Sequence, residues 1–326
     1  MKTIRLIAPA KTNLYLGVGQ RRDDGFHEVT TVMHALTMHD TLTMTHLGAG
    51  EHAVLLEPCD EAQPMRECPI DVEEGSGLLV DTKILWASDI EPIEVASDAN
   101  LATRAVNLLA KNLGRNVDEF IRIVIDKHIP SQAGLGGGSS DAAAAILGAA
   151  SFWGVSADDP KVEQTAAAIG ADVRFFLHGG CALLQGKGER YVRTLKPMKD
   201  SVTLIRPSVG VSTAEAYEVF DRAPAYPESD IIEAVNAAVE ATEVPLYNNM
   251  EIPAESLLDA FGEIREVAAA QAGVRDVLLC GSGSAVMAVC DDYASAQALS
   301  AIMQARGFWA RVTSFSSIRA ALMPDK

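Results

Sequence analysis

The sequence has 326 residues, of which 48% are hydrophobic and 22% are charged, and its formal net charge is −17. This length and composition are typical of a globular protein that is large enough for two domains. The negative charge argues against a surface that binds nucleic acid or an anionic membrane. The longest nearly apolar run, residues 142–155, is too short to cross a bilayer and predicts a buried helix.

The cysteines and the N-terminus predict a cytoplasmic protein. Five cysteines are an odd number, and none of them forms a C-x-x-C pair, which is typical of free thiols in a reducing compartment. The first residues, MKTIRLIAPAK, lack the apolar core and the cleavage site of a signal peptide.

The first 44 residues predict strands joined by a turn. Apolar residues alternate at Ile4 and Leu6 and again from Leu14 to Val18, so we expect a pair of strands interrupted by the segment APAKTN. Asp23-Asp24-Gly25 is a turn signal, and another strand is expected from there to Met44.

Residues 48–96 form an acidic segment, with twelve Asp or Glu against Arg66 and Lys83. The segment contains Pro58, Pro64, Pro69 and the Gly75-Ser76-Gly77 stretch, which favour a surface excursion between strands. The sequence leaves open whether this segment is only solvated or also binds a partner.

A glycine-dense turn follows the next two elements. Helical spacing predicts a helix over residues 100–113, capped by Asp98 or Asn100, and alternation predicts a strand over 120–129. The segment PSQAGLGGGSSDAAAA, residues 130–145, then leads into an alanine-rich helix that is expected to start near Ser139 or Ser140. Glycines leave backbone N–H groups uncovered at the positive end of the helix, where a phosphate can bind, although a tight turn without a ligand is the alternative. The segment matches neither the P-loop nor the Rossmann pattern.

The pattern restarts after Pro197. We expect a strand at VTLIRP, a helix from Thr213, a long helix over residues 253–272, an apolar strand VLLCGSGSAVMAV, a helix over 294–304 and a last strand over 309–312. The order of strands and helices predicts an α+β protein.

Five blocks of the sequence, in order and spacing, resemble the kinases of the galactokinase, homoserine kinase, mevalonate kinase and phosphomevalonate kinase (GHMP) superfamily. They are APAKTNLYLGV, RRDDGFHEVTTV, IPSQAGLGGGSSDAAAA, GADVRFFLHGGCALLQGKGE and CGSGSAVMAV. The resemblance is greatest to the branch that phosphorylates the 2-hydroxyl of a cytidine diphosphate-linked methylerythritol with ATP, a step of the non-mevalonate route to isoprenoids. It implies a two-domain GHMP kinase fold, with an N-terminal ribosomal-protein-S5-domain-2-like domain over residues 1–196 and a C-terminal ferredoxin-like α/β sandwich over residues 197–326.

The resemblance assigns catalysis to Asp172 and Lys11. Phosphoryl transfer needs a group that aligns or deprotonates the hydroxyl and cations that stabilise the transferring phosphoryl group. Asp172 matches the catalytic aspartate, although without the family it is an N-cap aspartate at the start of ADVRFFL. Lys11 matches the family lysine that orients this aspartate, although a lone lysine in an apolar strand pair can also extend to water.

The resemblance also implies which residues bind ATP and the acceptor. The ATP site is expected at Pro130, Ala133, Gly134, Leu135, Gly136, Gly137, Gly138, Ser139 and Ser140, with Lys127 and Asn100 near the adenine and ribose. The acceptor site is expected at Asn13, Phe26, His27, Tyr217, Gly281 and Ser282. Cytosine is an aromatic ring with donors and acceptors, so we expect it to stack between Phe26 and Tyr217 and to hydrogen-bond to His27. Each of these residues also has an ordinary structural explanation, such as hairpin core for Phe26 and helix packing for Tyr217.

The expected cofactor is Mg²⁺, which accompanies ATP, and the hydroxyl of Ser139 or Ser140 is a candidate ligand. The expected partners are ATP and the cytidyl acceptor, without nucleic acid or membrane, and the chain is expected to be a monomer or a homodimer. Two residues depart from the family pattern: Arg174 stands where proline is usual, where it can bind phosphate or pair with a carboxylate, and Gln132 replaces a small residue. A superfamily kinase for homoserine or mevalonate and a nucleotide-binding protein without catalysis are the alternatives.

Overall fold

The computed structural model describes residues 1–57 and 66–324. Its strands are β1 (Lys2–Arg21), β2 (His27–Gly48), β3 (His52–Glu57), β4 (Arg66–Asp71), β5 (Leu78–Trp86), β6 (Glu119–Lys127), β7 (Cys181–Gln185), β8 (Arg190–Leu195), β9 (Ser201–Arg206), β10 (Tyr247–Asn248), β11 (Val274–Leu279), β12 (Val286–Cys290), β13 (Trp309–Ser314) and β14 (Ala321–Leu322). Its α-helices are α1 (Leu101–Leu113), α2 (Gly137–Phe152), α3 (Pro160–Ile169), α4 (Ala171–His178), α5 (Thr213–Arg222), α6 (Ser229–Ala237), α7 (Glu251–Leu257), α8 (Asp259–Ala269) and α9 (Tyr293–Ala305).

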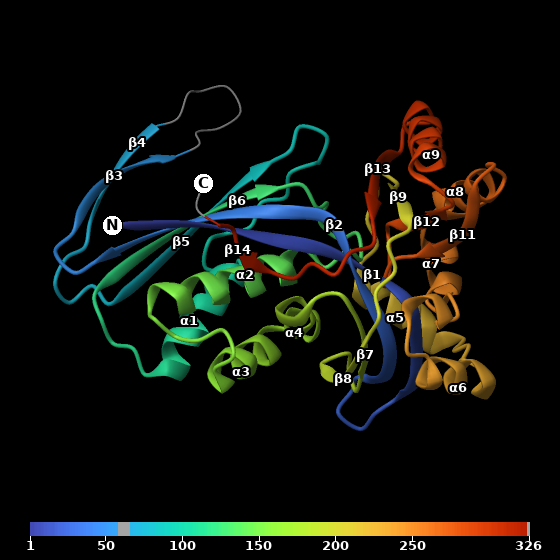
Figure 1. The fold of residues 1–326 in the computed structure, drawn as a ribbon, viewed down its shortest axis with the longest axis horizontal. Helices are drawn as coiled ribbons and strands as arrows, with labels where there is room; N and C mark the ends of the chain where they lie inside the picture. The colour runs from blue at the N-terminus through green and yellow to red at the C-terminus, as the bar shows by residue number, and fades with distance from the viewer. Residues whose placement is uncertain (58–65, 325–326) are drawn as a thin grey trace.

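Within the described residues the strands form three sheets (Figure 1). The largest has eight strands: β10-β1-β2-β6-β5 is its main path, β14 pairs with β1, and β7 pairs with β2 and β8. A four-stranded sheet has the order β11-β12-β9-β13, and β3 pairs with β4 alone. The mixture of helices with largely antiparallel sheets agrees with the predicted α+β class.

The longest strands, β1 and β2, form an antiparallel pair in the middle of the large sheet. The sequence predicted that the segment APAKTN interrupts the first strand, but β1 is continuous. Register shifts between Pro9 and Lys11 and between Asn13 and Tyr15 absorb the irregularity. Bulges of this kind bend a strand and redirect its side chains. The bent stretch is where Lys11 and Asn13 lie.

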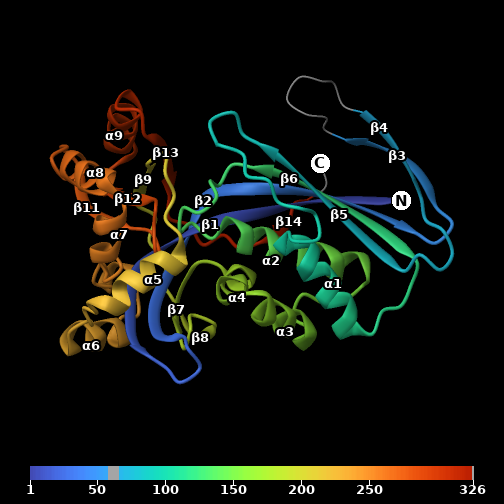
Figure 2. The same cartoon turned by 180° about the vertical axis from the view of Figure 1, so that it is seen from behind.

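Helices α1 to α4 lie on one side of the large sheet, and Figure 2 shows the same arrangement from behind. Helix α2 is almost completely buried, as its alanine-rich sequence predicts, and it packs between the sheet and the neighbouring helices. Asn100 caps α1, because its side chain accepts a hydrogen bond from the backbone N–H of Ala102. The alternative cap, Asp98, is therefore wrong.

Two elements in the second half differ from the sequence prediction, and a third agrees with it. The segment VLLCGSGSAVMAV is not one strand but two antiparallel strands, β11 and β12, with the glycine turn between them. The expected helix over residues 253–272 is two helices, α7 and α8, because Leu258 adopts an extended conformation between them. The helix from Thr213 is confirmed as α5.

The acidic segment 48–96 is only partly an excursion. Its β3–β4 pair projects from the sheet, with Val72 and Ala53 packed against Leu47 and Phe120. Strand β5, however, pairs in parallel with β6 along its full length and is an integral part of the large sheet. Residues 58–65 of this segment lie outside the described residues.

The division at residues 196 and 197 stays a prediction. The four-stranded sheet consists of strands that follow residue 197, but β10 and β14 also follow it and pair with β1 in the large sheet. Among the described residues, no helix has both the length and the apolar character that a membrane span requires.

Candidate active site

The glycine loop lies between β6 and α2 and contacts two other parts of the chain. The backbone N–H of Lys11 donates to the carbonyl of Leu135 at 3.0 Å, and the N–H of Ala285 donates to the carbonyl of Ala133 at 3.1 Å. Gly134 has φ of 75°, and a Cβ at this position would lie 1.9 Å from the carbonyl oxygen of Cys280. Only glycine therefore fits where the loop meets the turn between β11 and β12.

Helix α2 begins two residues earlier than the sequence suggested. Gly136 occupies the N-cap position with φ of 71°, and the backbone N–H of Ser140 donates to its carbonyl at 2.9 Å. Ser139 and Ser140 are therefore not caps but belong to the first turn of the helix. The first backbone N–H groups of α2 have no side-chain cap, so they are free for an anion.

The predicted ATP-binding residues gather around this loop in two layers. Gly134 and Gly136 line a cavity, and Gly138 is exposed, whereas the side chains of Pro130, Ala133 and Leu135 are buried and can offer a ligand only their backbone. Asn100 lies close by, because its neighbour Leu101 is the nearest contact of a Cβ built at Gly138.

Lys127 lies beneath the loop with two carboxylates. Its Nζ is 2.5 Å from Asp40 Oδ2 and 2.5 Å from Asp141 Oδ2, and all three side chains are buried. Burial by itself would lower the pKa of Lys127, but the two carboxylates outweigh it and raise the pKa. Asp40 Oδ1 also accepts hydrogen bonds from the N–H groups of His128 and Ile129. The group thus ties the end of β6 to the N-terminal part of α2.

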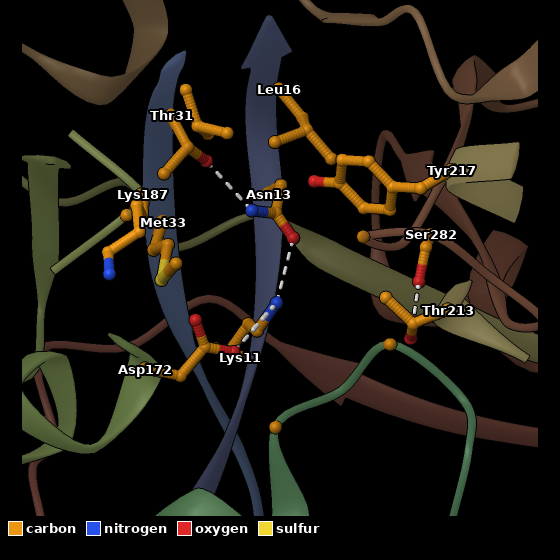
Figure 3. A pocket seen from close by; sticks show the side chains of 15 residues that line it. Lys11, Asn13, Leu16, Thr31, Met33, Asp172, Lys187, Thr213, Tyr217 and Ser282 are labelled. Atoms are coloured by element: carbon orange, nitrogen blue, oxygen red, sulfur yellow. Dashed lines mark hydrogen bonds and ion pairs between the residues drawn. The ribbon is translucent and has the colours of Figure 1, made fainter. Parts of the chain in front are cut away.

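Lys11 and Asp172 meet at the floor of the cavity (Figure 3). Lys11 Nζ lies 3.4 Å from Asp172 Oδ2 and donates to Asn13 Oδ1 at 2.9 Å, and Asn13 Nδ2 donates to Thr31 Oγ1 at 2.8 Å. Lys11 is only 4% exposed, so it is held by these partners and does not extend to water. Asp172 keeps 28% of its side chain exposed and faces the cavity.

Asp172 is not an N-cap, as its sequence position had also allowed. Gly170 holds that position in α4, and Asp172 is the second residue of the helix. A carboxylate in the first turn interacts favourably with the positive end of the helix. Arg174, two residues on, donates to Glu163 Oε2 at 2.9 Å, so of its two expected roles it adopts the pairing with a carboxylate.

Two adjoining cavities make up the site. The first, of about 220 Å³, is lined by Lys11, Asn13, Asp172 and the glycine turn at Gly281 and Ser282. The second, of about 650 Å³, contains Phe26 and His27 together with Asp221. They share four lining residues, Val29, Lys187, Thr213 and Tyr217, so they form one continuous depression.

The second cavity has aromatic and polar groups of the kind that bind a cytosine, and the predicted Phe26, His27 and Tyr217 all line it. His27 Nε2 donates to Asp221 Oδ1 at 2.7 Å, which orients the ring. Tyr217 packs against His27, with ring centroids 5.2 Å apart, and not against Phe26, whose face is 4.2 Å from Lys187 Nζ. Burial, with the nearby charge of Asp172 in addition, raises the pKa of Tyr217 to about 12, so its phenol stays protonated.

Four residues that line the cavities were not predicted from the sequence: Thr31, Lys187, Thr213 and Asp221. Thr31 follows His27 at the period of two that marks one face of a strand, which is a signal that was available. Thr213, whose hydroxyl lies 3.0 Å from that of Ser282, and Asp221 are brought in by α5, and no local pattern announces them.

The site suits a hard cation that arrives with ATP. Among the described residues there is no group of three or more metal-binding side chains, so phosphate oxygens and water would have to supply most ligands. Asp172 provides a partly exposed carboxylate, and Ser139 provides a half-buried hydroxyl, whereas Ser140 is fully buried. Carboxylate and hydroxyl oxygens are donors that fit Mg²⁺, and Ser139 is the more accessible of the two predicted serines.

Comparison with known proteins gives a consistent family. Residues 100–180 match the model of the GHMP kinases N terminal domain. Proteins called 4-diphosphocytidyl-2-C-methyl-D-erythritol kinase are similar to the chain over nearly their full length: that of Desulfitobacterium hafniense is 31% identical, covering 95% of both chains, and that of Gloeobacter violaceus is 32% identical, covering 93% of this chain and 91% of the relative.

Solved structures agree. A crystal structure of 4-(cytidine 5'-diphospho)-2C-methyl-D-erythritol kinase superposes with a TM-score of 0.73 at 28% identity, covering 96% of this chain and all of that one. Homoserine kinase from Cytophaga hutchinsonii shares the fold at 16% identity, with a TM-score of 0.68 over 99% of this chain and 98% of that one. The chain therefore belongs to the 4-diphosphocytidyl-2-C-methyl-D-erythritol kinases and has the two-part α+β fold of the GHMP kinases.

Proposed function

We propose that this enzyme transfers the γ-phosphoryl group of ATP to the 2-hydroxyl of 4-diphosphocytidyl-2-C-methyl-D-erythritol, a step of the non-mevalonate route to isoprenoids. The observation that carries the proposal is the pair of Lys11 and Asp172 at 3.4 Å, located between the glycine loop and a cavity with aromatic and polar groups. ATP and the acceptor would thus bind at separate sites, with Asp172 between them.

In this proposal the phosphates of ATP bind the uncapped N–H groups of α2. The loop glycines allow the phosphates to approach the backbone closely, and the positive end of the helix stabilises their charge. Mg²⁺ would be held by the phosphates, by Asp172 and by Ser139, and when bound it neutralises phosphate charge.

Asp172 aligns the acceptor hydroxyl and accepts its proton as the new P–O bond forms, while the bond between the γ-phosphorus and the β,γ-bridging oxygen of ATP breaks and ADP leaves. Lys11 keeps the carboxylate in place and offsets the charge that spreads over the transferring phosphoryl group. Asn13 holds Lys11 through its carbonyl oxygen and is itself held by Thr31. Tyr217 remains a protonated donor at the edge of the cavity and does not compete with Asp172 as a base.

The cytosine is proposed to bind in the larger cavity, between Phe26 and Tyr217 and against His27. Homoserine and mevalonate have no aromatic base to occupy this cavity, which disfavours the two alternative acceptors. A protein without catalysis is disfavoured because Lys11 and Asp172 are both present and in contact.

Coupled detection of ADP with a substrate panel tests the proposal. With Mg²⁺ and ATP, the cytidyl substrate should support turnover, while homoserine and mevalonate should not, and EDTA should abolish the reaction. Asp172→Asn should lose about 100-fold or more in kcat, as expected for a positioned acid or base, while its circular dichroism spectrum stays that of the folded protein. Asp276→Asn, at an exposed position on β11 outside the site, is the matched control. Comparable turnover of homoserine, or a fully active Asp172→Asn variant, would count against the assignment.

A further inference from the structure

Lys187 lies where the two cavities join. It sits in the turn between β7 and β8 and lines both the cavity that contains Asp172 and the cavity that contains His27. Figure 3 shows it on one side of the depression, with Thr213 and Tyr217 on the other side and Asn13 between them. Any acceptor that occupies both cavities must pass between Lys187 and Thr213.

The other cations of the depression are already paired. Lys11 contacts Asp172 and Asn13, and Arg21 lies 3.6 Å from Asp221. Lys187 makes no ion pair with any carboxylate in the part of the chain that the structure describes; its ammonium contacts only the face of Phe26, 4.2 Å from the ring centroid. A cation–π contact at an exposed position is weak, so it does not prevent the ammonium from binding an anion.

The opposite wall offers hydroxyl groups and a helix N-terminus, and the same helix also carries Glu215 in its first turn and Glu218 and Asp221 at the second cavity. Thr213 is the first residue of α5, a helix of ten residues whose N-cap is Ser212, and its hydroxyl and that of Ser282 lie 3.0 Å apart. The positive end of a helix and two hydroxyl groups therefore face Lys187 across the passage.

We propose that Lys187 is the residue that binds the diphosphate of the acceptor and thereby positions the acceptor between the cytosine cavity and Asp172. This inference rests on the proposed function and refines it. The diphosphate is the only anionic part of the acceptor, and it lies between the base and the sugar alcohol, as Lys187 lies between the two cavities. Lys187 acts by positioning, and it takes no part in the transfer of the phosphoryl group.

Binding of CDP and of cytidine, measured by calorimetry, separates this role from a merely structural one. Lys187→Gln should weaken CDP binding about five- to tenfold, the effect of one charge-assisted contact, and should leave cytidine binding unchanged. Lys187→Arg should restore most of the CDP affinity. With the full substrate, Lys187→Gln should raise KM for the acceptor while KM for ATP stays the same.

Lys196→Gln is the matched control, because it removes the same charge from an exposed lysine that pairs with Glu240 outside both cavities. If Lys187→Gln lost affinity for CDP and cytidine equally, or lost none for CDP, the inference would be overturned. The proposed function would still stand if the wild type phosphorylated the cytidyl substrate. A wild type that fails to phosphorylate the cytidyl substrate would instead contradict the proposed function itself.

Discussion

Replacing Gly134 by alanine tests how the glycine loop is held. The added methyl group would lie 1.9 Å from the carbonyl oxygen of Cys280, a contact that backbone atoms cannot tolerate, and the residue would have to keep φ of 75°. The left-handed conformation costs an L-residue about 1 to 2 kcal/mol. Relief of the clash would separate the loop from the turn between β11 and β12, and so break the hydrogen bonds that Ser284 and Ala285 donate to the loop.

Two lost backbone hydrogen bonds at about 0.5 to 1.5 kcal/mol each, added to the strain, give an expected loss of about 2 to 5 kcal/mol in unfolding free energy. Urea denaturation followed by circular dichroism measures this loss. Because the same displacement moves the N–H groups that are proposed to bind phosphate, KM for ATP should rise as well.

Gly138→Ala is the matched control for Gly134→Ala. A Cβ at Gly138 meets only Leu101 at 3.6 Å, an ordinary contact, and the residue belongs to helix α2 without a positive φ. Alanine is favoured over glycine in helices by up to about 1 kcal/mol, so stability should be equal or slightly greater. Equal stability of Gly134→Ala and the wild type, or a comparable loss in both variants, would refute the reasoning.

Three further predictions concern other parts of the chain. Asp221→Asn weakens the hydrogen bond that orients His27, so KM for the cytidyl acceptor should rise while KM for ATP stays constant in steady-state kinetics; a change in KM for ATP alone would contradict the placement of cytosine. Burial raises the pKa of Asp141 to about 7 from its usual 3.8, with Asp40 adding to the rise and Lys127 opposing it. The folded protein then holds a proton that the unfolded chain has released, so this carboxyl makes the unfolding free energy fall as pH rises from about 4 to about 7. Urea titrations at pH 5 and pH 8 should show Asp141→Asn gaining stability relative to the wild type at the higher pH, and parallel profiles would argue otherwise. Burial also raises the pKa of Cys181 to about 12 and that of Cys280 to about 11, so both thiols should react with a disulfide reagent only after unfolding, and rapid labelling of either in the native protein would be inconsistent with the structure.

Periodicity and capping residues correctly predicted the helices and strands whose own sequence sets their conformation. The alternation of residues 120–129 and the spacing of residues 100–113 correspond to β6 and α1, and Asn100 caps α1. The α+β class followed from the order of such elements. The pairing of Lys11 with Asp172 came from the resemblance to a family, because 161 positions separate the two residues and no periodicity links them.

The errors occurred where tertiary contacts decide the outcome. Gly136 begins α2 because it alone can adopt the left-handed conformation there, although serine is the commoner cap. Leu258 interrupts the expected long helix because it is extended between α7 and α8, and its side chain is buried with Phe261 in one core cluster. Lys187 and Asp221, which were not predicted, reach the site through the packing of a hairpin turn and a helix, which composition does not encode.

The alternation of side chains along β2 also sets a length. His27, Val29, Thr31 and Met33 lie on the same face of the strand and line the two cavities in order. At about 3.3 Å per residue, the six steps from His27 to Met33 cover about 20 Å. In the proposed binding mode, with the base beside His27 and the hydroxyl beside Asp172, an acceptor must be long enough to span this stretch of β2. A short alcohol can occupy the His27 end or the Met33 end of this stretch but not both. In this binding mode, discrimination among acceptors depends on molecular length as well as on any single contact.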